Sequence, residues 1–282
     1  MPCDLHTHSV YSDGTYTPAE LIDEAVKRGL SAIALTDHNT ASGVPEFLAA
    51  AEGKPILAIG GTELSCEHTT PRGRVDVHML ALFLPPSSYA LIEERNAEMM
   101  KRKRESYIEL EARLAKDGMI IDYAEICKRS INLPNRAAIA EELMRRGYVS
   151  SIKEAFSEIL RDGGKYYHSP KYPSVIETVD FIISIGAIPV LAHPFLNLNE
   201  DELIPLLSEA REHGLCGMEV FYSKYDEKTT TRSIEIAESA KIMQSGGSDF
   251  HGSRKPDIAL GVGMGALCVP DECVNNILHF KR

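Results

Sequence analysis

Short apolar runs rich in β-branched residues alternate along the chain with segments whose apolar residues recur at helical spacing. This alternation is typical of βα units and a parallel sheet, because each strand is followed by a helix that returns the chain to the same edge. Seven runs predict strands, at residues 3–7, 31–37, 56–63, 75–84, 187–192, 217–222 and 241–247. The pattern therefore predicts an α/β fold, and 282 residues fit one large barrel or two ordinary domains.

The helix between the first two predicted strands has clear boundaries. Thr17-Pro18-Ala19-Glu20 has the form of a capping box with proline at the first helical position. Gly29 follows the last helical residues and supplies a C-terminal stop. We expect a helix of about three turns here, connecting the first strand to the second.

Two longer stretches, residues 87–128 and 134–162, interrupt the alternation with helical patterns, the second as two short helices around Gly147. We therefore predict a helical insertion over residues 87–165, between the fourth and fifth strands. Residues 1–86 and 166–282 then form the barrel that carries the chemistry. A long insertion on a barrel often supplies a lid or a substrate pocket.

Histidines and carboxylates gather where the predicted strands end. His6 and His8 close the first strand at positions i and i+2, so their side chains point the same way. In an α/β barrel the carboxyl ends of the strands form the active-site face. A mixed set of imidazoles and carboxylates suits Zn²⁺, Mn²⁺ or Fe and predicts a site for several metal ions. The candidate ligands are His6, His8, Asp13, His38, Glu63, His78, His193, Asp249 and His251.

Five motifs carry a resemblance to a known family: Asp4-Leu5-His6-Thr7-His8-Ser9, Thr36-Asp37-His38-Asn39, Gly61-Thr62-Glu63, Ala192-His193-Pro194 and Ser248-Asp249-Phe250-His251. In this order they resemble the PHP (polymerase and histidinol phosphatase) family, which is related to the amidohydrolases. The resemblance spans about residues 3–255 and implies a distorted (β/α)₇ barrel. Within the family the chain looks most like small bacterial phosphoesterases that carry a helical insertion after the fourth strand.

The resemblance also implies how the ligands are shared. One metal would be held by His6, His8 and Asp249, and Glu63 would bridge to a second held by His78 and His193. A third position would use Asp13, His38 and His251. Family members with a trinuclear centre often have a histidine where this chain has Asp13, so the resemblance implies two cations, Mn²⁺ first, and leaves the third open. We expect Asp37 to orient a ligand histidine.

Composition limits the partners. The net charge of −11 argues against binding to long nucleic acid, whose phosphates require basic surfaces, but not against a small phosphorylated substrate. No apolar run is long enough to span a bilayer, and the first residues lack the pattern of a signal peptide. Six dispersed cysteines without a CxxC pair fit a reduced, cytoplasmic protein. The sequence does not predict an oligomeric state.

Two bridged cations favour phosphoester hydrolysis, because a shared hydroxide can attack phosphorus while the cations neutralise phosphate oxygens. We expect Glu63, His193, Asp249 and His251 to be catalytic, and the sequence does not choose among the last three as proton carrier. Arg136, in Leu133-Pro134-Asn135-Arg136, resembles the arginine with which the family grips a substrate phosphate. The other candidate substrate contacts are Lys165, His168 and Arg254.

Several functions remain open from the sequence. The first hypothesis is removal of the 3′-phosphate from a nucleotide that also bears a 5′-phosphate, with Arg136 holding the second phosphate. The second is a phosphodiesterase acting on a cyclic or short phosphodiester, such as a cyclic sugar phosphate. Histidinol-phosphate phosphatase activity ranks below these, as do amide or lactone hydrolysis and a non-catalytic barrel kept for binding.

Overall fold

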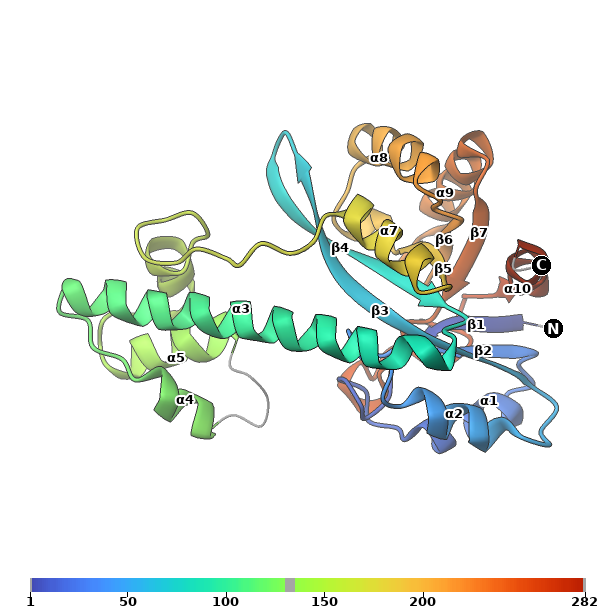
Figure 1. The fold of residues 1–282 in the computed structure, drawn as a ribbon, viewed down its shortest axis with the longest axis horizontal. Coiled ribbons are helices and arrows are strands. Elements are labelled where there is room, and N and C mark those ends of the chain that lie inside the picture. The colour runs from blue at the N-terminus through green and yellow to red at the C-terminus, as the bar shows by residue number, and fades with distance from the viewer. Residues whose placement is uncertain (1, 130–134, 281–282) are drawn as a thin grey trace. The chain divides into compact units, whose positions relative to one another are not determined.

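The computed structural model describes residues 2–129 and 135–280 and divides the chain into two compact units. The first unit consists of Met1–Glu94 and Tyr172–Arg282 and contains all the strands; we call it the barrel unit (Figure 1). The second, Arg95–Lys171, contains only helices and turns in its described part, and we call it the helical unit. Each unit has its own apolar core, so each is described by itself.

One sheet of eight strands forms the barrel unit, in the order β7-β6-β5-β4-β3-β2-β1-β8. All seven strands predicted from the sequence are present. The eighth is a short strand that pairs antiparallel with β1 and that the sequence pattern did not reveal. The strands are β1 (Pro2–Thr7), β2 (Ala32–Leu35), β3 (Leu57–Thr70), β4 (Gly73–Leu82), β5 (Ile188–Ala192), β6 (Gly217–Tyr222), β7 (Met243–Gly247) and β8 (Val269–Pro270).

The sheet curls until its first and seventh strands meet, which gives the predicted distorted barrel. Just beyond the two strand ends, the His8 N–H donates to the Phe250 carbonyl at 2.9 Å and the Asp249 N–H donates to the His6 carbonyl at 2.9 Å. Gly247 permits this approach, because a Cβ there would lie 2.4 Å from the Cβ of His6. The closure brings the metal-ligand motifs at the two ends of the chain to one place.

The prediction of a wholly parallel sheet was wrong at β4. This strand runs antiparallel to both β3 and β5. The physical reason is the short connection after Thr70, which pairs with Gly73, since a two-residue turn joins only antiparallel strands. β3 also continues seven residues beyond Glu63, to Thr70, because its second half pairs with β4 throughout.

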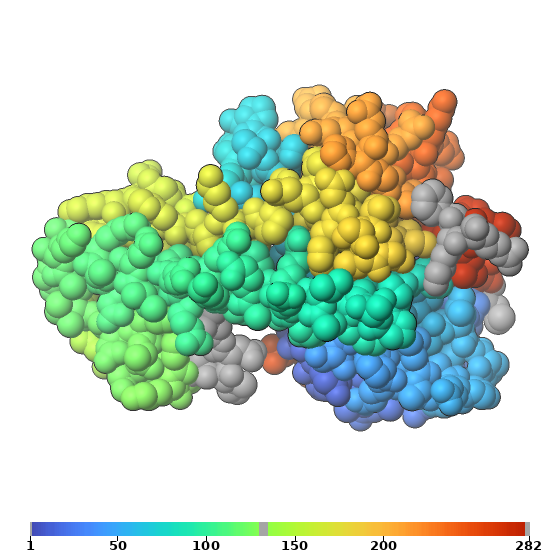
Figure 2. All heavy atoms as spheres, viewed as in Figure 1, coloured from blue at the N-terminus to red at the C-terminus, as the bar shows by residue number. Residues whose placement is uncertain are grey.

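Helices cover the outside of the barrel unit, and Figure 2 shows α7 and α8 on its surface. The predicted first helix is confirmed with its complete capping box between Thr17 and Glu20. None of the helices in the described part of the chain is long and apolar enough to cross a membrane. The helices of this unit are α1 (Pro18–Lys27), α2 (Val44–Ala51), α7 (Val175–Ser184), α8 (Glu200–Glu212), α9 (Glu227–Ala240) and α10 (Asp271–Phe280).

Alternate residues of the strands divide the core of the barrel unit into two apolar clusters. Leu80 and Val190 belong to a cluster that the strands form with α10, whereas Met79 and Leu191 pack with the helices α1, α2, α7, α8 and α9. This two-sided burial explains why β2 and β5 are almost wholly apolar in sequence. Polar residues buried in such strands are therefore exceptions that need a chemical reason.

The helical unit contains most of α3 (Tyr89–Lys116), which begins in the barrel unit. It continues with α4 (Tyr123–Arg129), α5 (Arg136–Arg145) and α6 (Ile152–Glu154), and a π-helical turn at Ala155–Ile159 follows α6. The two short helices predicted around Gly147 are thus confirmed. The unit buries a core of its own, which includes Tyr107, Leu110, Leu114, Tyr123, Ile126, Ile139 and Leu143.

Candidate metal centre

Glu63 is the centre of the candidate site. It is almost completely buried, on β3 where the strand passes the end of β2. A buried carboxylate needs several polar partners, and ring nitrogens approach both of its oxygens. Oε1 lies 2.7 Å from His78 Nδ1 and 2.9 Å from His193 Nε2. Oε2 lies 3.0 Å from His38 Nδ1 and 3.3 Å from Nε2 of both His6 and His8.

Two further carboxylates, those of Asp249 and Asp13, lie near His8 and His251. Asp249 Oδ1 lies 3.3 Å from His8 Nε2 and 3.4 Å from His251 Nδ1. Asp13 Oδ1 lies 3.2 Å from His251 Nε2 and 3.8 Å from both His38 Nε2 and His8 Nδ1. All nine residues proposed from the sequence therefore come together in the barrel unit.

The arrangement fits divalent metal ions better than a set of ordinary hydrogen bonds. Nε2 of His6 and Nε2 of His8 face each other at 3.1 Å, so both of these nitrogens can be metal ligands only when a cation replaces the proton between them. Within the described residues, the buried atoms His8 Nδ1 and Glu63 Oε2 have no hydrogen-bond partner. Cations placed among these atoms would satisfy them. The overlapping groups able to hold an ion include His6–His8–Glu63, His38–Glu63–His78 and His8–Asp13–His38–His251.

Burial and charge prepare the ligands for metal binding. Burial lowers the pKa of His8 to about 3, which keeps its imidazole neutral with a free lone pair. Burial by itself would raise the pKa of Glu63, but the imidazoles of His78 and His6 outweigh it and hold that pKa well below its usual value. Glu63 is therefore an anion, as a bridging ligand must be.

Glu219 is a member of the site that the sequence analysis missed. It is fully buried on β6, where its Oε1 lies 3.1 Å from His6 Nδ1 and its Oε2 accepts the His193 N–H at 2.8 Å. A carboxylate on the second nitrogen of a metal-binding imidazole fixes the tautomer and strengthens the ligand. The available signal was a glutamate inside the otherwise apolar strand Gly217–Tyr222.

Asp37 was expected to orient a ligand histidine, but the hydrogen bonds of its carboxylate go to serines instead. Its carboxylate accepts the backbone N–H of Ser9 at 2.8 Å and the hydroxyls of Ser9 at 2.6 Å and Ser12 at 2.5 Å. Asp37 thus fixes the loop that carries Asp13. Asp4 has a similar structural task, because it accepts two hydrogen bonds from Ser248, just before Asp249.

Three residues at this end of the barrel have left-handed backbone conformations that non-glycine residues rarely adopt. They are Asn39 with φ 54°, His193 with φ 27° and Asp249 with φ 56°. Such conformations cost of order 1–3 kcal/mol each and persist where the surroundings impose them. Each one occurs at or next to a candidate ligand.

The candidate substrate contacts are less closely grouped. Lys165 pairs with Asp117 and the His168 ring lies 3.0 Å from the Gly164 carbonyl, both within the helical unit. Arg136 begins α5, and its guanidinium lies over the rings of Phe156 and Tyr167. Residues 133 and 134 of the predicted arginine motif lie outside the described residues.

On the barrel side, Arg254 is exposed, and the neighbouring Lys255 contacts the ligands instead. Its Nζ lies 2.7 Å from Asp249 Oδ2, the oxygen that also accepts the Tyr222 hydroxyl at 2.8 Å. Sequence analysis missed Lys255 and Tyr222, because no motif connects them to Asp249.

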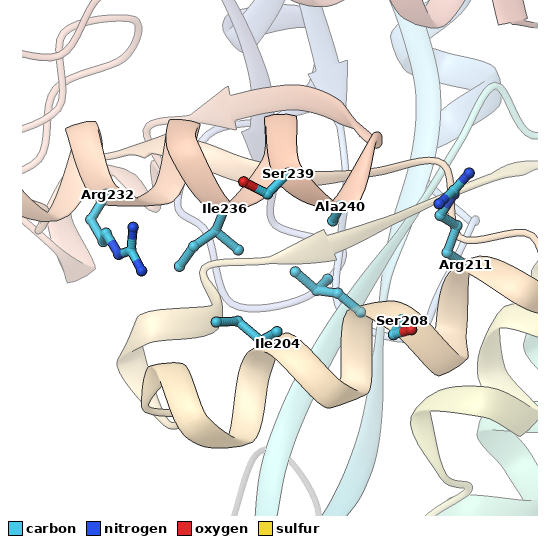
Figure 3. Close-up of a pocket in the computed structure, with 8 residues that line it drawn as sticks. Ile204, Ser208, Arg211, Arg232, Ile236, Ser239 and Ala240 are labelled. Carbon is cyan, nitrogen blue, oxygen red and sulfur yellow. The ribbon is translucent and has the colours of Figure 1, made fainter.

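A hollow of about 290 Å³ between α8 and α9 lies apart from the ligand cluster (Figure 3). Ile204 and Ile236 form its apolar walls, and Arg211 and Arg232 stand toward its two ends. No histidine or carboxylate lines it, so it offers none of the chemistry expected of a metal centre.

The comparison with protein families decides the assignment. The model of the PHP domain matches residues 4–161, which include six of the nine candidate ligands. The chain belongs to the PHP family.

Three proteins that are similar in sequence to this chain have names that describe phosphoester hydrolysis. The chain is 28% identical to a phosphoribosyl 1,2-cyclic phosphate 1,2-diphosphodiesterase of Eggerthella lenta, over 92% of this chain and 98% of that protein. It is 30% identical to a 3′,5′-nucleoside bisphosphate phosphatase of Chromobacterium violaceum, over 88% and 86%. It is 29% identical to a 5′-3′ exoribonuclease of Haemophilus influenzae, over 88% and 89%.

A solved structure agrees over the whole length. It is a Bifidobacterium adolescentis protein assigned as a metal-dependent phosphoesterase, with a TM-score of 0.69, 28% identity and coverage of 99% of this chain and 97% of that one. With the family match and the phosphoesterase relatives, it makes this chain a metal-dependent phosphoester hydrolase. The predicted enzyme class and barrel fold are confirmed.

Proposed function

We propose that the protein removes a phosphate from a small phosphorylated metabolite at the cluster centred on Glu63, and that a nucleotide 3′,5′-bisphosphate is the substrate. The observation that carries the proposal is the position of Glu63, whose two oxygens face five imidazole nitrogens. A carboxylate so placed suits a bridge between two cations; a mixed set of imidazoles and carboxylates suits Mn²⁺, Zn²⁺ or Fe, and of these we propose Mn²⁺. The third position, at Asp13, completes the ligand set.

Bound cations would neutralise phosphate oxygens and lower the pKa of the attacking water. The residues of the chain supply the rest. Burial by itself would raise the pKa of Asp249, but its hydrogen bond with His8 and the charges of nearby imidazoles hold it well below the usual value. Asp249 is thus ionised near neutral pH, as a metal ligand must be, and His251 and His193 are the candidate proton donors to the leaving oxygen.

A second phosphate on the substrate would need a contact of its own, and Arg136 of the helical unit is the residue that the sequence suggests for it. Arg136 is exposed at the start of α5, with its guanidinium lying over two aromatic rings that restrict its orientation. Burial and the charge of Arg136 lower the pKa of Lys103, so two basic groups lie close enough to repel each other. An anion relieves such repulsion, and a guanidinium can hold phosphate through two hydrogen bonds. We assign Arg136 to this second phosphate, and give Lys165 and His168 a supporting role in the same unit.

The cyclic phosphodiesterase is the second candidate, favoured by the similarity to the Eggerthella lenta enzyme along nearly the whole chain. The same cations and ligands serve either reaction, since both begin with attack of water on phosphorus.

The six cysteines are all free thiols, which fits a reaction in the cytoplasm.

Three substrates separate the candidates when they are offered to Mn²⁺-loaded protein. Release of inorganic phosphate from adenosine 3′,5′-bisphosphate supports the proposal. Ring opening of a ribose 1,2-cyclic phosphate without activity on the bisphosphate favours the second candidate, and stepwise shortening of a 5′-phosphorylated oligoribonucleotide favours an exonuclease. Inactivity on all phosphomonoesters refutes the first proposal.

Arg136→Ala tests the second phosphate. We expect its KM for adenosine 3′,5′-bisphosphate to rise at least about tenfold, as loss of a charge-assisted hydrogen bond requires. Its KM for 3′-AMP, which lacks the second phosphate, is expected to stay near that of the wild type. An equal change for both substrates contradicts the assignment, and turnover of an amide or lactone that the substitution leaves unchanged would favour amide or lactone hydrolysis instead.

A further inference from the structure

Lys255 is a basic side chain in direct contact with the candidate metal ligands. It follows the short 3₁₀ turn Gly252–Arg254, and its Nζ lies 2.7 Å from Asp249 Oδ2. The side chain of Lys255 is 33% exposed, whereas that of Asp249 is 7% exposed. Lys255 is therefore partly open to solvent, whereas the carboxylate that it contacts is buried.

The two oxygens of Asp249 have different surroundings. Oδ1 faces ring nitrogens of His8 and His251 at 3.3 and 3.4 Å, in the position of a metal ligand. Oδ2 accepts the hydroxyl of the buried Tyr222 at 2.8 Å. It therefore has two partners, the Tyr222 hydroxyl and the Lys255 ammonium. An ammonium has three N–H donors, and the contact with Asp249 uses one of them.

A positively charged lysine beside a cluster that binds cations is unusual, because like charges repel each other. Cations bound near Asp249 would repel an ammonium a few ångströms away, because electrostatic interactions are weakly screened at a buried site. A dianionic phosphate that bridges the cations and the ammonium removes this repulsion. The position of Lys255 is thus favourable when phosphate is bound and less favourable without it.

We propose that Lys255 binds a phosphate oxygen of the substrate, and that Asp249 and Tyr222 hold its ammonium in position. This inference rests on the proposed function, since it adds a phosphate contact from the barrel unit to the one assigned to Arg136. It also transfers to Lys255 the role expected of Arg254, whose side chain is exposed one position earlier.

Inorganic phosphate is the probe, and its dissociation constant for Mn²⁺-loaded protein is measured by calorimetry. Lys255→Met removes the charge, and Lys255→Arg keeps it. The matched control is Lys54→Met, because Lys54 also pairs with a carboxylate, Asp23, and is 34% exposed on the surface. Metal content is measured for every variant by elemental analysis, and folding by circular dichroism.

We expect Lys255→Met to keep its metal and bind phosphate about ten- to a hundredfold more weakly, as loss of a charge-assisted hydrogen bond requires. Lys255→Arg should recover most of the affinity, and Lys54→Met should match the wild type. A phosphate affinity of Lys255→Met within twofold of the wild type at saturating Mn²⁺ overturns the inference, even if that variant binds metal more weakly. Wild-type protein that holds metal but binds no phosphate overturns the proposed function as well.

Discussion

Replacing Glu63 with glutamine removes one charge and leaves the shape of the side chain almost unchanged. Five imidazole nitrogens lie within 3.3 Å of the two Glu63 oxygens. Any cation held among these atoms would therefore lose its electrostatic attraction to the negative charge of Glu63. At an effective dielectric constant of about 20, a unit charge 4 Å away contributes about 4 kcal/mol. For a divalent ion that interaction is larger, and 4 kcal/mol already corresponds to about a thousandfold in affinity.

We therefore expect Glu63→Gln to bind Mn²⁺ at least about a thousandfold more weakly and to lose phosphoesterase activity. Calorimetric titration with Mn²⁺ and elemental analysis of the purified variant measure the effect. Glu67→Gln is the control, because Glu67 lies four residues later on β3 and pairs with Arg74 at 3.3 Å, away from the ligands. The reasoning is refuted if Glu63→Gln retains two equivalents of metal with wild-type affinity.

Three further predictions follow from the same cluster. Asp13→Ala should lose a third equivalent of metal and keep two, and elemental analysis that finds no metal left would contradict this. Glu219→Gln should weaken metal binding about 10- to 100-fold, since it frees the His6 ring, and a calorimetric affinity equal to the wild type would refute it. Burial opposes protonation of His6 and His78, but nearby carboxylates raise both pKa values. Both rings therefore bind a proton more tightly than a free imidazole does, and a metal ion must compete with that proton, so metal affinity should fall as pH falls, with net proton release in paired-buffer calorimetry.

The gathering of the candidate ligands in one place could be predicted from the sequence, because their positions follow simple geometric rules. His6 and His8 converge since they are two residues apart at the end of a strand, and Asp249 and His251 meet them because parallel strands end at one face. The first helix could be predicted equally well, since its N-terminus is capped by local hydrogen bonds between Thr17 and Glu20. Interactions set by near neighbours or by a repeated unit are visible in sequence.

The orientation of β4 could not be predicted in this way, and neither could the residues that contact the candidate ligands, such as Glu219 and Lys255. β4 was assigned to a parallel sheet because its apolar pattern is the same in either direction, and only the two-residue turn after Thr70 reveals the reversal. His78 nevertheless reaches the site from the middle of the strand, where it pairs with Ala192 of β5. The assignment of a strand's direction depends on connection length more than on its apolar pattern.

Contacts between distant parts of the chain explain the remaining omissions. Glu219 meets His6 across 213 residues, and no local pattern links them. Lys255 lies one position from the predicted Arg254, and the turn Gly252–Arg254 decides which of the two side chains faces Asp249. Sequence reasoning named Arg254, whereas the backbone conformation brings the neighbouring side chain of Lys255 to Asp249.

The most direct test of the account is phosphate release from adenosine 3′,5′-bisphosphate by one preparation of protein before chelation, after chelation and after reloading with Mn²⁺. We predict activity that disappears with the metal and returns when about two or more equivalents are bound, as a centre bridged by Glu63 requires. A protein that binds less than one equivalent, or that binds two and hydrolyses no phosphoester, would contradict it.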